Sequence, residues 1–464
     1  MRLFWHRRDL RLRDNRGLAA AAAEGAVVPV FVRDPDLLDR VGDRQRAFFL
    51  RGVRRLREAY RDRGGDLLVR EGAPSEVLPE LAEELGADAV GYNEHYRPER
   101  RERRDRVEAA CADAGVETAS ETDLVLVDPA RLDERYPNHG RFRDAWEKVP
   151  KEPPAPAPDA ADLASVDGAD PGSVPDEPAV DIDLPAAGYR AARERYDAFL
   201  DDGIGSYRET RDDLAAAVAE PTLAVSRMSP YLAAGMIGVR EVWADASERH
   251  DAATGDERDD VWKYLDELTW REGNYHLLYY SPDLPSANYE SIPNPIEWRD
   301  DPETFDAWTR GETGYPLVDA GMRQLRAEGY IHNRPRQVVA SFLTKHLLVD
   351  WRKGRRHFAE RLIDHDPASN AGNWQWIAST GTDSVDVRIF DPVAQMDKYD
   401  DGAAFVKRYV PELRDVDPSK AVEWPTLPAA ERERLAPGYP DPIVDRNAGY
   451  ERAQRTFERA LGKR

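Results

Sequence analysis

The chain opens with "RLFWHRRDLRLRDN" (residues 2–15), a short apolar run that passes at once into a charged segment. Similar runs rich in β-branched residues recur after it, and stretches with helical periodicity separate them. Strands that alternate with helices in this way form a parallel, doubly wound sheet. The predicted strands cover residues 2–5, 26–32, 66–72, 87–93 and 123–129, and the predicted helices include 44–63 and 75–85.

The charged segment 6–15 belongs at the edge of this sheet, because it follows the first strand directly. Ligands of doubly wound sheets bind beyond the carboxyl ends of the strands. Asn15 is a suitable N-cap for the helix that follows. The chain contains neither a G-x-G-x-x-G fingerprint nor a P-loop, so the pattern does not predict an ordinary NAD or ATP domain.

The pattern changes at residues 150–186, which are rich in Pro, Ala and Asp, a composition typical of an extended linker. Beyond residue 187 apolar residues recur at helical spacing, for example over 336–351. Eight of the eleven tryptophans lie between residues 243 and 376. We therefore predict an α/β domain over residues 1–130, a linker over 131–186 and an all-α domain over 187–464.

The composition predicts a soluble cytoplasmic protein. Hydrophobic residues make up 41% of the chain, and no apolar run is long enough to span a bilayer. The N-terminal residues lack the apolar core of a signal peptide. Cys111 is the only cysteine, which excludes intramolecular disulfides and a cysteine-based zinc cluster.

The net charge of −22 is carried by abundant Asp and Glu, and the basic residues are mostly Arg. An acidic surface stays hydrated in high salt, so we interpret the composition as halophilic adaptation; an ordinary acidic protein is the alternative. Residues 331–361 run against this trend, with eight basic residues and two acidic ones. This basic patch indicates either a phosphate-binding surface or a solvated face.

Two polar motifs are candidates for binding sites. In "SRMSPYLAAG" (226–235), Ser229 and Pro230 are typical of a helix start, which either binds phosphate or serves only as a cap. In "LDELTWREGNYH" (265–276), Glu267 and Arg271 share one helix face, which indicates a functional pair or a surface ion pair.

A third motif, "LIDHDPASNAGNWQW" (362–376), brings carboxylates close to His365. Those residue types suit a metal ion, but no second histidine–carboxylate cluster has a matching spacing. We therefore predict no metal site.

These motifs resemble those of the photolyase/cryptochrome flavoproteins, most closely the class I cyclobutane pyrimidine dimer photolyases. The resemblance covers nearly the whole chain outside the linker. It is carried also by "FWHRRDLRLRDN", "TGYPLVDAGMRQL", "IHNRPRQ", "SFLTKHLLVDWRKG" and "RIFDP". It implies an N-terminal antenna domain, a helical domain that binds FAD, and light-driven repair in which excited FADH⁻ donates an electron to a flipped-out pyrimidine dimer.

The resemblance also implies which residues bind FAD. Arg336 and Asp364 pair over the isoalloxazine ring, Asp366 lies near the ring or ribityl edge, and Asn370 faces N5. A neutral amide accepts a hydrogen bond from protonated N5 and so favours the reduced flavin. The complete predicted set is Tyr207, Ser226, Arg227, Met228, Ser229, Arg271, Arg336, Asp364, Asp366 and Asn370.

Trp374 and Trp376 lie two residues apart, which on a helix is about 200°, so they face opposite ways. By resemblance Trp374 touches the flavin and begins an electron-hopping path that continues through Trp351 to Trp298. Trp376 instead lines the lesion cavity together with Trp270.

The remaining implied sites concern DNA. Glu267 and Asn333 hydrogen-bond the damaged pyrimidines, and the basic patch contacts the backbone of UV-damaged DNA. The implied DNA-binding residues are Arg211, Arg334, Gln337, Arg388 and the cluster at 352–356.

Two alternatives remain within the family. Gln337 stands where many dimer photolyases have methionine, and it resembles the DASH-type proteins that act on single-stranded DNA; Trp376 favours the dimer photolyases. A cryptochrome photoreceptor is the other alternative, although plant receptors commonly have aspartate at the position of Asn370.

The antenna chromophore is expected in the N-terminal domain, where "YNEHYRPERRERRD" (92–105) lies at a strand end. We expect 8-hydroxy-deazaflavin rather than methenyltetrahydrofolate, on the inference that the salt adaptation indicates a halophilic archaeon. We expect a monomer with no membrane partner.

Overall fold

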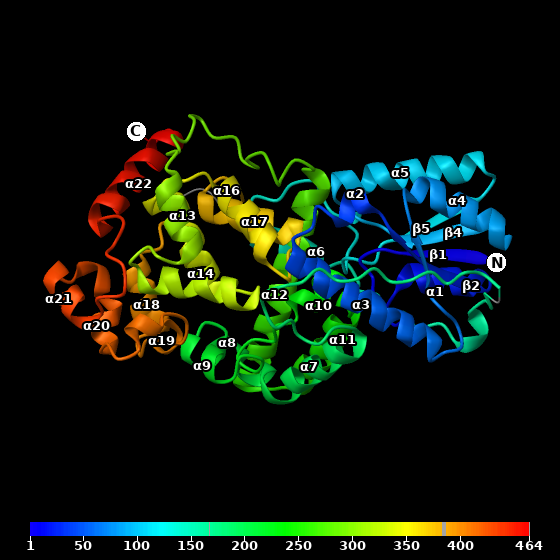
Figure 1. The fold of residues 1–464 in the computed structure, drawn as a ribbon, viewed down its shortest axis with the longest axis horizontal. Helices are drawn as coiled ribbons and strands as arrows, with labels where there is room; N and C mark the ends of the chain where they lie inside the picture. The colour runs from blue at the N-terminus through cyan, green and yellow to red at the C-terminus, as the bar shows by residue number, and fades with distance from the viewer. Residues whose placement is uncertain (167, 383–386, 464) are drawn as a thin grey trace.

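The computed structural model describes residues 1–166, 168–382 and 387–463. Two domains lie side by side along the long axis of the molecule (Figure 1). The N-terminal domain holds the sheet, and the C-terminal domain is helical, with α12 near the junction (Figure 1). This arrangement confirms the predicted fold class.

The sheet has five parallel strands in the order β3-β2-β1-β4-β5. Its strands are β1 (Arg2–His6), β2 (Val27–Arg33), β3 (Leu68–Glu71), β4 (Ala89–Asn93) and β5 (Glu117–Glu121). Successive side chains of a strand face opposite sides, so Leu3 and Trp5 enter one core while Phe4 enters the other. The carboxyl ends of β1, β2 and β4 therefore meet at one edge, which faces the helical domain.

Helices cover both faces of the sheet. The helices of this domain are α1 (Arg16–Glu24), α2 (Pro35–Leu38), α3 (Asp43–Arg61), α4 (Pro74–Leu85) and α5 (Pro98–Asp113). α1 and α3 share a core with Phe4, whereas α4 and α5 share the other core with Leu3. Asn15 caps α1 as predicted, accepting from the Leu18 amide at 3.1 Å.

The predicted strand at 123–129 is wrong. The fifth strand is the polar segment Glu117–Glu121, which pairs with β4. The apolar residues after it are bound to the helical domain instead: Arg240 donates to the Val125 carbonyl at 2.9 Å, and Glu272 accepts from the amides of Leu126 and Val127 at 2.9 and 3.2 Å. Side chains of the helical domain therefore make the backbone hydrogen bonds that a neighbouring strand would otherwise make with this segment.

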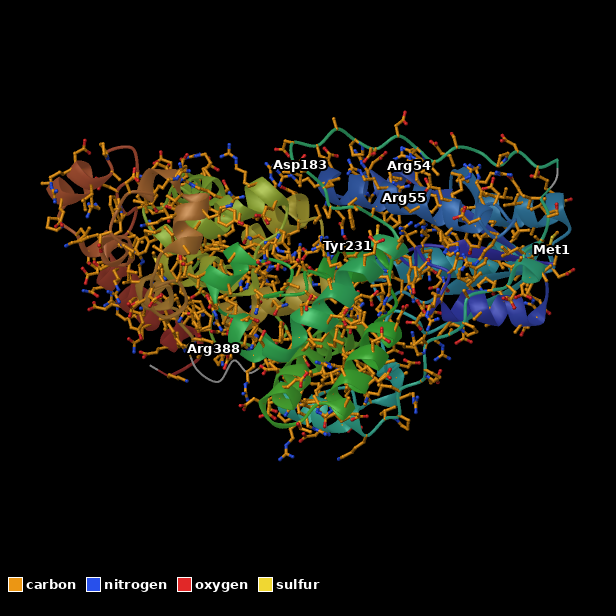
Figure 2. All side chains as sticks on the ribbon, turned by 90° about the horizontal axis from the view of Figure 1, so that it is seen from below. Met1, Arg54, Arg55, Asp183, Tyr231 and Arg388 are labelled. Carbon is orange, nitrogen blue, oxygen red and sulfur yellow. The ribbon has the colours of Figure 1, made fainter. Side chains whose placement is uncertain are left out.

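The linker runs over the surface of the N-terminal domain in mostly extended form, with one 3-10 turn at Ala160–Asp162. Arg44 pairs with Asp181 at 2.8 Å, and Arg54 pairs with Glu177 at 3.3 Å. Figure 2 shows its Asp183 on the same side of the molecule as Arg54 and Arg55 of α3, away from Arg388. The predicted linker also contains a helix, α6 (His139–Glu147), which packs on α12.

The helical domain has one large core and further smaller ones. Its first helices are α7 (Tyr189–Asp202), α8 (Tyr207–Thr210), α9 (Leu214–Ala219), α10 (Ser229–Ala234), α11 (Val239–Ala252), α12 (Gly255–Tyr280), α13 (Pro302–Arg310) and α14 (Pro316–Glu328). They are followed by α15 (Asn333–Ser341), α16 (Trp351–Arg361), α17 (Pro367–Ala378), α18 (Pro392–Tyr399), α19 (Ala404–Tyr409), α20 (Pro418–Val422), α21 (Ala429–Leu435) and α22 (Arg446–Ala460). Short 3-10 turns lie at Pro129–Arg131, Ile204–Ser206, Pro411–Leu413 and Trp424–Thr426.

The periodic stretch 336–351 is not one helix. α15 passes into a π-helical turn at Phe342–His346, and Leu348 then adopts a left-handed conformation with φ 54°. The chain turns there, and Trp351 begins α16. This break lets α15, α16 and α17 pack around one another and form the walls of the site.

Candidate functional site

A cleft between α15 and α17 brings together six of the predicted site residues. Asp366 caps α17 by accepting from the Ser369 amide at 2.9 Å, and the helix then carries its side chains toward α15. The cleft is lined by Asn333, Arg336, Gln337, Asn370, Trp374 and Trp376.

One wall of the cleft carries an ion pair. Arg336 Nη2 lies 3.4 Å from Asp364 Oδ2, and the Ser229 hydroxyl donates to the same oxygen at 2.7 Å. Among the described residues, Asp364 Oδ1 and Arg336 Nε are buried and have no hydrogen-bond partner. Buried polar atoms are normally satisfied, so a ligand with both donors and acceptors fits this wall. The isoalloxazine ring of FAD has both.

Ser229 does not cap α10 as predicted. The cap is Met228, Ser229 is the first helical residue, and its hydroxyl reaches across to Asp364. Arg227, just before, adopts φ 48° and pairs with Glu328 at 2.8 Å. The segment therefore joins α10 to the ion-pair wall.

Tyr207 and Ser226 lie near this segment. Tyr207 begins α8 and packs edge-on against Phe199 and Tyr264. Burial raises the pKa of Tyr207 well above its ordinary value. Burial also raises the pKa of Tyr264 to about 12, against a hydrogen bond from Ser226. Both tyrosines are therefore neutral polar groups.

Asp366 and Arg271 lie at the junction with the N-terminal domain. Asp366 pairs with Arg8 at 3.1 Å and accepts from the Tyr275 hydroxyl. Burial alone would raise the pKa of Asp366, but Arg8 and Arg271 lower it to about 2. Arg271 donates to the Leu124 carbonyl at 2.9 Å. The two residues thus connect the flavin-domain motifs to the sheet edge.

The three predicted electron-transfer tryptophans belong to one core. Trp374 is buried edge-on against Phe358, with ring centres 5.1 Å apart. Trp351 is fully buried, and its indole N–H donates to Asn288 at 3.2 Å. Trp298 is half-buried and lies edge-on to Phe457 at 5.9 Å. The series therefore runs from the cleft toward the surface.

Glu267 does not pair with Arg271, the partner that helical spacing predicts. Its carboxylate lies 3.0 Å from Arg211 Nη2 and 2.8 Å from Lys263 Nζ. Arg271 points to the other side, toward Leu124. Two cationic side chains therefore fix the position of the Glu267 side chain.

Trp270 and Trp376 line separate clefts. Trp376 faces the α15–α17 cleft, and the Arg388 guanidinium stacks over its ring at 3.9 Å. Trp270 lines a second cavity of about 40 Å³ together with residues of α6. The structure therefore does not bring the two rings together as one cavity wall.

Arg334 is already engaged within the protein. It pairs with Asp212 at 2.7 Å, donates to Gln337 Oε1 at 2.8 Å and stacks over Tyr399 at 4.2 Å. Gln337 therefore orients Arg334, and both lie on the α15 face predicted to meet DNA.

A separate cavity of about 300 Å³ lies between the domains, at the carboxyl ends of β1 and β2. Trp5, Phe31, Phe48 and Phe49 form its apolar part. Nine arginines line it against Asp34 and Glu360: Arg7, Arg8, Arg33, Arg40, Arg97, Arg100, Arg103, Arg355 and Arg356.

We predicted that the whole 352–356 cluster lies on the DNA face. The structure corrects this prediction in part, because Arg355 and Arg356 line the interdomain cavity. Burial first, and neighbouring arginines second, lower the pKa of Arg100 and that of Arg355. In the described residues, the Nε atoms of both are buried without a hydrogen-bond partner. Such a site fits an anionic ligand.

Sequence reasoning missed two residues that shape these sites. Arg8 was read only as part of a charged sheet edge, yet it pairs with Asp366, 358 positions away. His139 was placed in the linker, yet its ring stacks on Trp270. The sequence signal for His139 was the apolar period of "RFRDAW" after Asn138, which marks a capped helix.

No helix among the described residues is long and apolar enough to cross a membrane. The described residues also hold no group of three or more His, Cys, Asp or Glu side chains that could bind a metal.

Comparisons with known proteins match both domains. Residues 2–159 match the family model described as DNA photolyase, and residues 264–459 match the FAD binding domain of DNA photolyase. The chain is 45% identical to a deoxyribodipyrimidine photo-lyase of Halobacterium salinarum, with 100% of both chains covered. It is 35% identical to a cryptochrome DASH of Natronomonas pharaonis, covering 96% of this chain and 98% of that one. The crystal structure of a class III photolyase from Agrobacterium tumefaciens superposes with a TM-score of 0.89 at 34% identity, covering 100% and 98%.

Proposed function

The chain belongs to the DNA photolyase family, and from this premise we propose how its residues divide the work of light-driven DNA repair. The activity is that of a deoxyribodipyrimidine photo-lyase, which splits pyrimidine dimers in DNA. The observation that carries the residue assignment is the α15–α17 cleft, where the Arg336–Asp364 pair leaves buried polar atoms without partners. When bound and excited in its reduced form, FAD supplies the electron that splits the dimer.

The residues that would hold FAD come from three segments. Arg336 and Asp364 neutralise each other's charge in the wall of the cleft. Their unpaired atoms offer one donor and one acceptor to the isoalloxazine ring. Asn370 offers a neutral amide, fixed by its bond to the Arg355 carbonyl at 3.1 Å. Tyr207 and the 226–229 segment hold the sugar and phosphates. Asp366 and Arg271 support the site from the domain junction.

Trp374, Trp351 and Trp298 conduct electrons from the surface to the cleft. Trp374 and Trp351 are buried, with 2% and 0% exposure, whereas Trp298 is half-buried. A buried ring near the cleft and an accessible ring near solvent suit the two ends of such a path.

The residues assigned to the lesion are Asn333 and Trp376 at the α15–α17 cleft and Glu267 and Trp270 on α12, and the two tryptophan rings line separate cavities in this structure. Enzymes that act on a base extrude it from the duplex and stack it on aromatic walls. Glu267, which pairs with Arg211 at 3.0 Å, offers acceptor oxygens to pyrimidine N–H groups. Arg334, Gln337 and Arg388 contact the DNA backbone around it.

The interdomain cavity is our candidate for the antenna site. Its aromatic floor suits a planar chromophore, and its arginines suit an anionic one. We favour 8-hydroxy-deazaflavin, whose ring hydroxyl can ionise, over methenyltetrahydrofolate. Extraction of the native protein and mass spectrometry of the released chromophores test this choice, and a folate would overturn it. A monomeric state and a cytoplasmic location remain predictions from the sequence.

Light-dependent repair tests the proposal. The photoreduced protein is mixed in high salt with a duplex that carries one thymine dimer, and absorbance at the thymine band is followed under blue light and in the dark. Recovery in light alone supports dimer repair. Recovery only on single strands moves the chain to the DASH type and implicates Gln337. No recovery on either substrate, with fully reduced flavin, favours a photoreceptor.

A further inference from the structure

His139 is held against the face of a tryptophan that we assign to the lesion site. The two rings are nearly parallel, at 13°, with centres 3.6 Å apart. His139 begins α6, in the segment that precedes the linker proper, whereas Trp270 lies on α12. The contact therefore joins two elements that are 131 positions apart in sequence.

A hydrogen bond fixes the orientation of the imidazole. His139 Nε2 lies 3.0 Å from Thr269 Oγ1, and the Thr269 hydroxyl donates its one hydrogen to the Asp266 carbonyl at 2.8 Å. The hydroxyl oxygen must therefore accept from the histidine, which we assign as the Nε2–H tautomer. The ring cannot rotate freely over Trp270 without losing this bond.

The surroundings keep the imidazole neutral. The pKa of His139 is lowered to about 4, chiefly by burial; Asp266 opposes this shift, and Arg143 and Lys263 add to it. A neutral ring can stack on an indole without desolvating a charge. The ring also packs against Gly273, one turn after Trp270, where a Cβ would lie 3.4 Å from Nδ1.

We propose that His139 is a positioning residue for lesion recognition, in that its imidazole covers one face of Trp270 and fixes the opposite face as a wall for the pyrimidine dimer. This inference rests on the proposed role of Trp270. A tryptophan without a stacking partner on one side can adopt other rotamers. Binding of the dimer then has to fix one rotamer, and the lost conformational entropy weakens the binding.

The test is a comparison of variants in dimer affinity and in repair at saturating substrate. His139→Ala is expected to weaken binding of a dimer-containing duplex by about 3- to 10-fold, the range of one aromatic pair. Flavin absorbance and the repair rate at saturation are expected to stay unchanged. His139→Phe restores a flat ring without the N–H. We expect its affinity for the dimer-containing duplex to lie within about twofold of the wild-type value, because the stacked ring pair is kept and only its polar edge is lost.

A second histidine–tryptophan contact provides a matched control. His250 of α11 lies against Trp262 of α12, eight residues before Trp270, with ring centres 5.9 Å apart and planes at 54°. His250→Ala is expected to leave dimer affinity unchanged. A double-variant cycle adds the decisive readout, because His139→Ala should have no further effect once Trp270 is alanine.

Three results would overturn the inference. If His139→Ala binds like the wild type while Trp270→Ala loses affinity, the lesion assignment survives without His139. If His139→Phe binds as weakly as His139→Ala, stacking on Trp270 is not the role of His139. Additive losses in the cycle show that His139 acts elsewhere. If the wild type repairs no dimer in light, the proposed function fails and this inference fails with it.

Discussion

In the α15–α17 cleft and its surroundings three predicted arginines stand beside carboxylates, whereas several arginines of the interdomain cavity stand beside one another. Arg336 faces Asp364, Arg211 faces Glu267, and Arg334 faces Asp212. In the cavity, Arg100 and Arg355 have no ion pair among the described residues, and burial first and neighbouring guanidinium groups second lower the pKa of each. The charges of the α15–α17 cleft are thus compensated by the protein itself, whereas the unpaired arginines of the cavity suit an anionic ligand.

The two regions also differ in how a removed charge should change stability. A buried pair loses stability when one partner is removed, because the other is left uncompensated. A buried cluster of like charges gains stability when one member is removed. Variants of opposite expected sign therefore test the contrast.

The largest effect is expected for Asp364→Asn, which removes the charge facing Arg336 and keeps the shape. We expect a loss of about 3 kcal/mol of unfolding free energy, since breaking a buried ion pair costs this much, and a loss of bound flavin. Denaturant unfolding and the flavin absorbance of the purified protein measure both.

The matched control for Asp364→Asn is Asp300→Asn. Asp300 pairs with Lys353 at 2.7 Å, but its side chain is 86% exposed. Exposed pairs contribute at most about 1 kcal/mol. Equal losses of unfolding free energy in Asp364→Asn and Asp300→Asn would contradict the view that Arg336 and Asp364 form a buried ion pair.

The next effect concerns the lesion carboxylate. Glu267→Gln removes a charged acceptor, and hydrogen bonds to charged groups contribute about 1.5–3 kcal/mol. We expect kcat/KM for dimer repair to fall by roughly 10- to 100-fold, with flavin binding retained. Steady-state repair under constant light gives the value.

Glu257→Gln serves as the control for this variant, because Glu257 lies on the same helix and, among the residues that the structure describes, pairs only with the exposed Arg249. Its repair rate should match the wild type. A Glu267→Gln protein with unchanged kcat/KM would remove Glu267 from the lesion site.

Asp366 lies between the two regions. Its lowered pKa predicts that the unfolding free energy of the protein falls at acidic pH. Its folded pKa is about 2, below the ordinary value of roughly 3.9. A depressed carboxyl pKa contributes stability that is complete above about pH 4 and is lost as pH falls toward 2. We expect roughly 2 kcal/mol from this group.

Unfolding free energies of the wild type and of Asp366→Asn, measured between pH 6 and 3, test this. The wild type should lose more stability over that interval than the variant does. Parallel curves would show that the Arg8–Asp366 pair does not set the pKa of this carboxyl.

The smallest effect is expected in the cavity and has the opposite sign. Arg100→Met should stabilise the ligand-free protein by about 1 kcal/mol, because a buried unpaired charge is replaced by an apolar side chain. It should also reduce the gain in Tm that inorganic phosphate gives the wild type at constant ionic strength.

Arg106→Met is the control here, because Arg106 lies on the same helix but faces solvent. It should change neither the Tm nor the response to phosphate. If Arg100→Met lowers the unfolding free energy as much as Asp364→Asn does, the charge of Arg100 in the cavity is compensated by the protein, as the charges in the cleft are.

Much of the fold could be predicted because its signals are local. Four buried strands were found from short β-branched runs, and Asn15 was recognised as a cap because capping depends on neighbours three residues away. The fifth strand was placed on the most apolar nearby segment. An edge strand needs less apolar character than a segment buried between two domains, so the polar stretch 117–121 was overlooked.

The candidate site was predictable as a set of residues and less so as a set of partners. The motifs around α15 and α17 identified the cleft, yet helical spacing alone paired Glu267 with Arg271. In the structure Arg211, 56 positions earlier, reaches Glu267 instead. Spacing limits which side chains share a face but does not say what the neighbouring helix presents to that face.

The sequence by itself determined the fold class, the family and the residue types at the cleft, because strand alternation, helical periodicity and contiguous motifs are carried by nearby residues. Only the tertiary structure decided that Arg355 and Arg356 line the interdomain cavity, that Asp366 pairs with Arg8, and that His139 covers Trp270. Each of these contacts joins elements far apart in the chain, and their geometry follows from how the two domains pack.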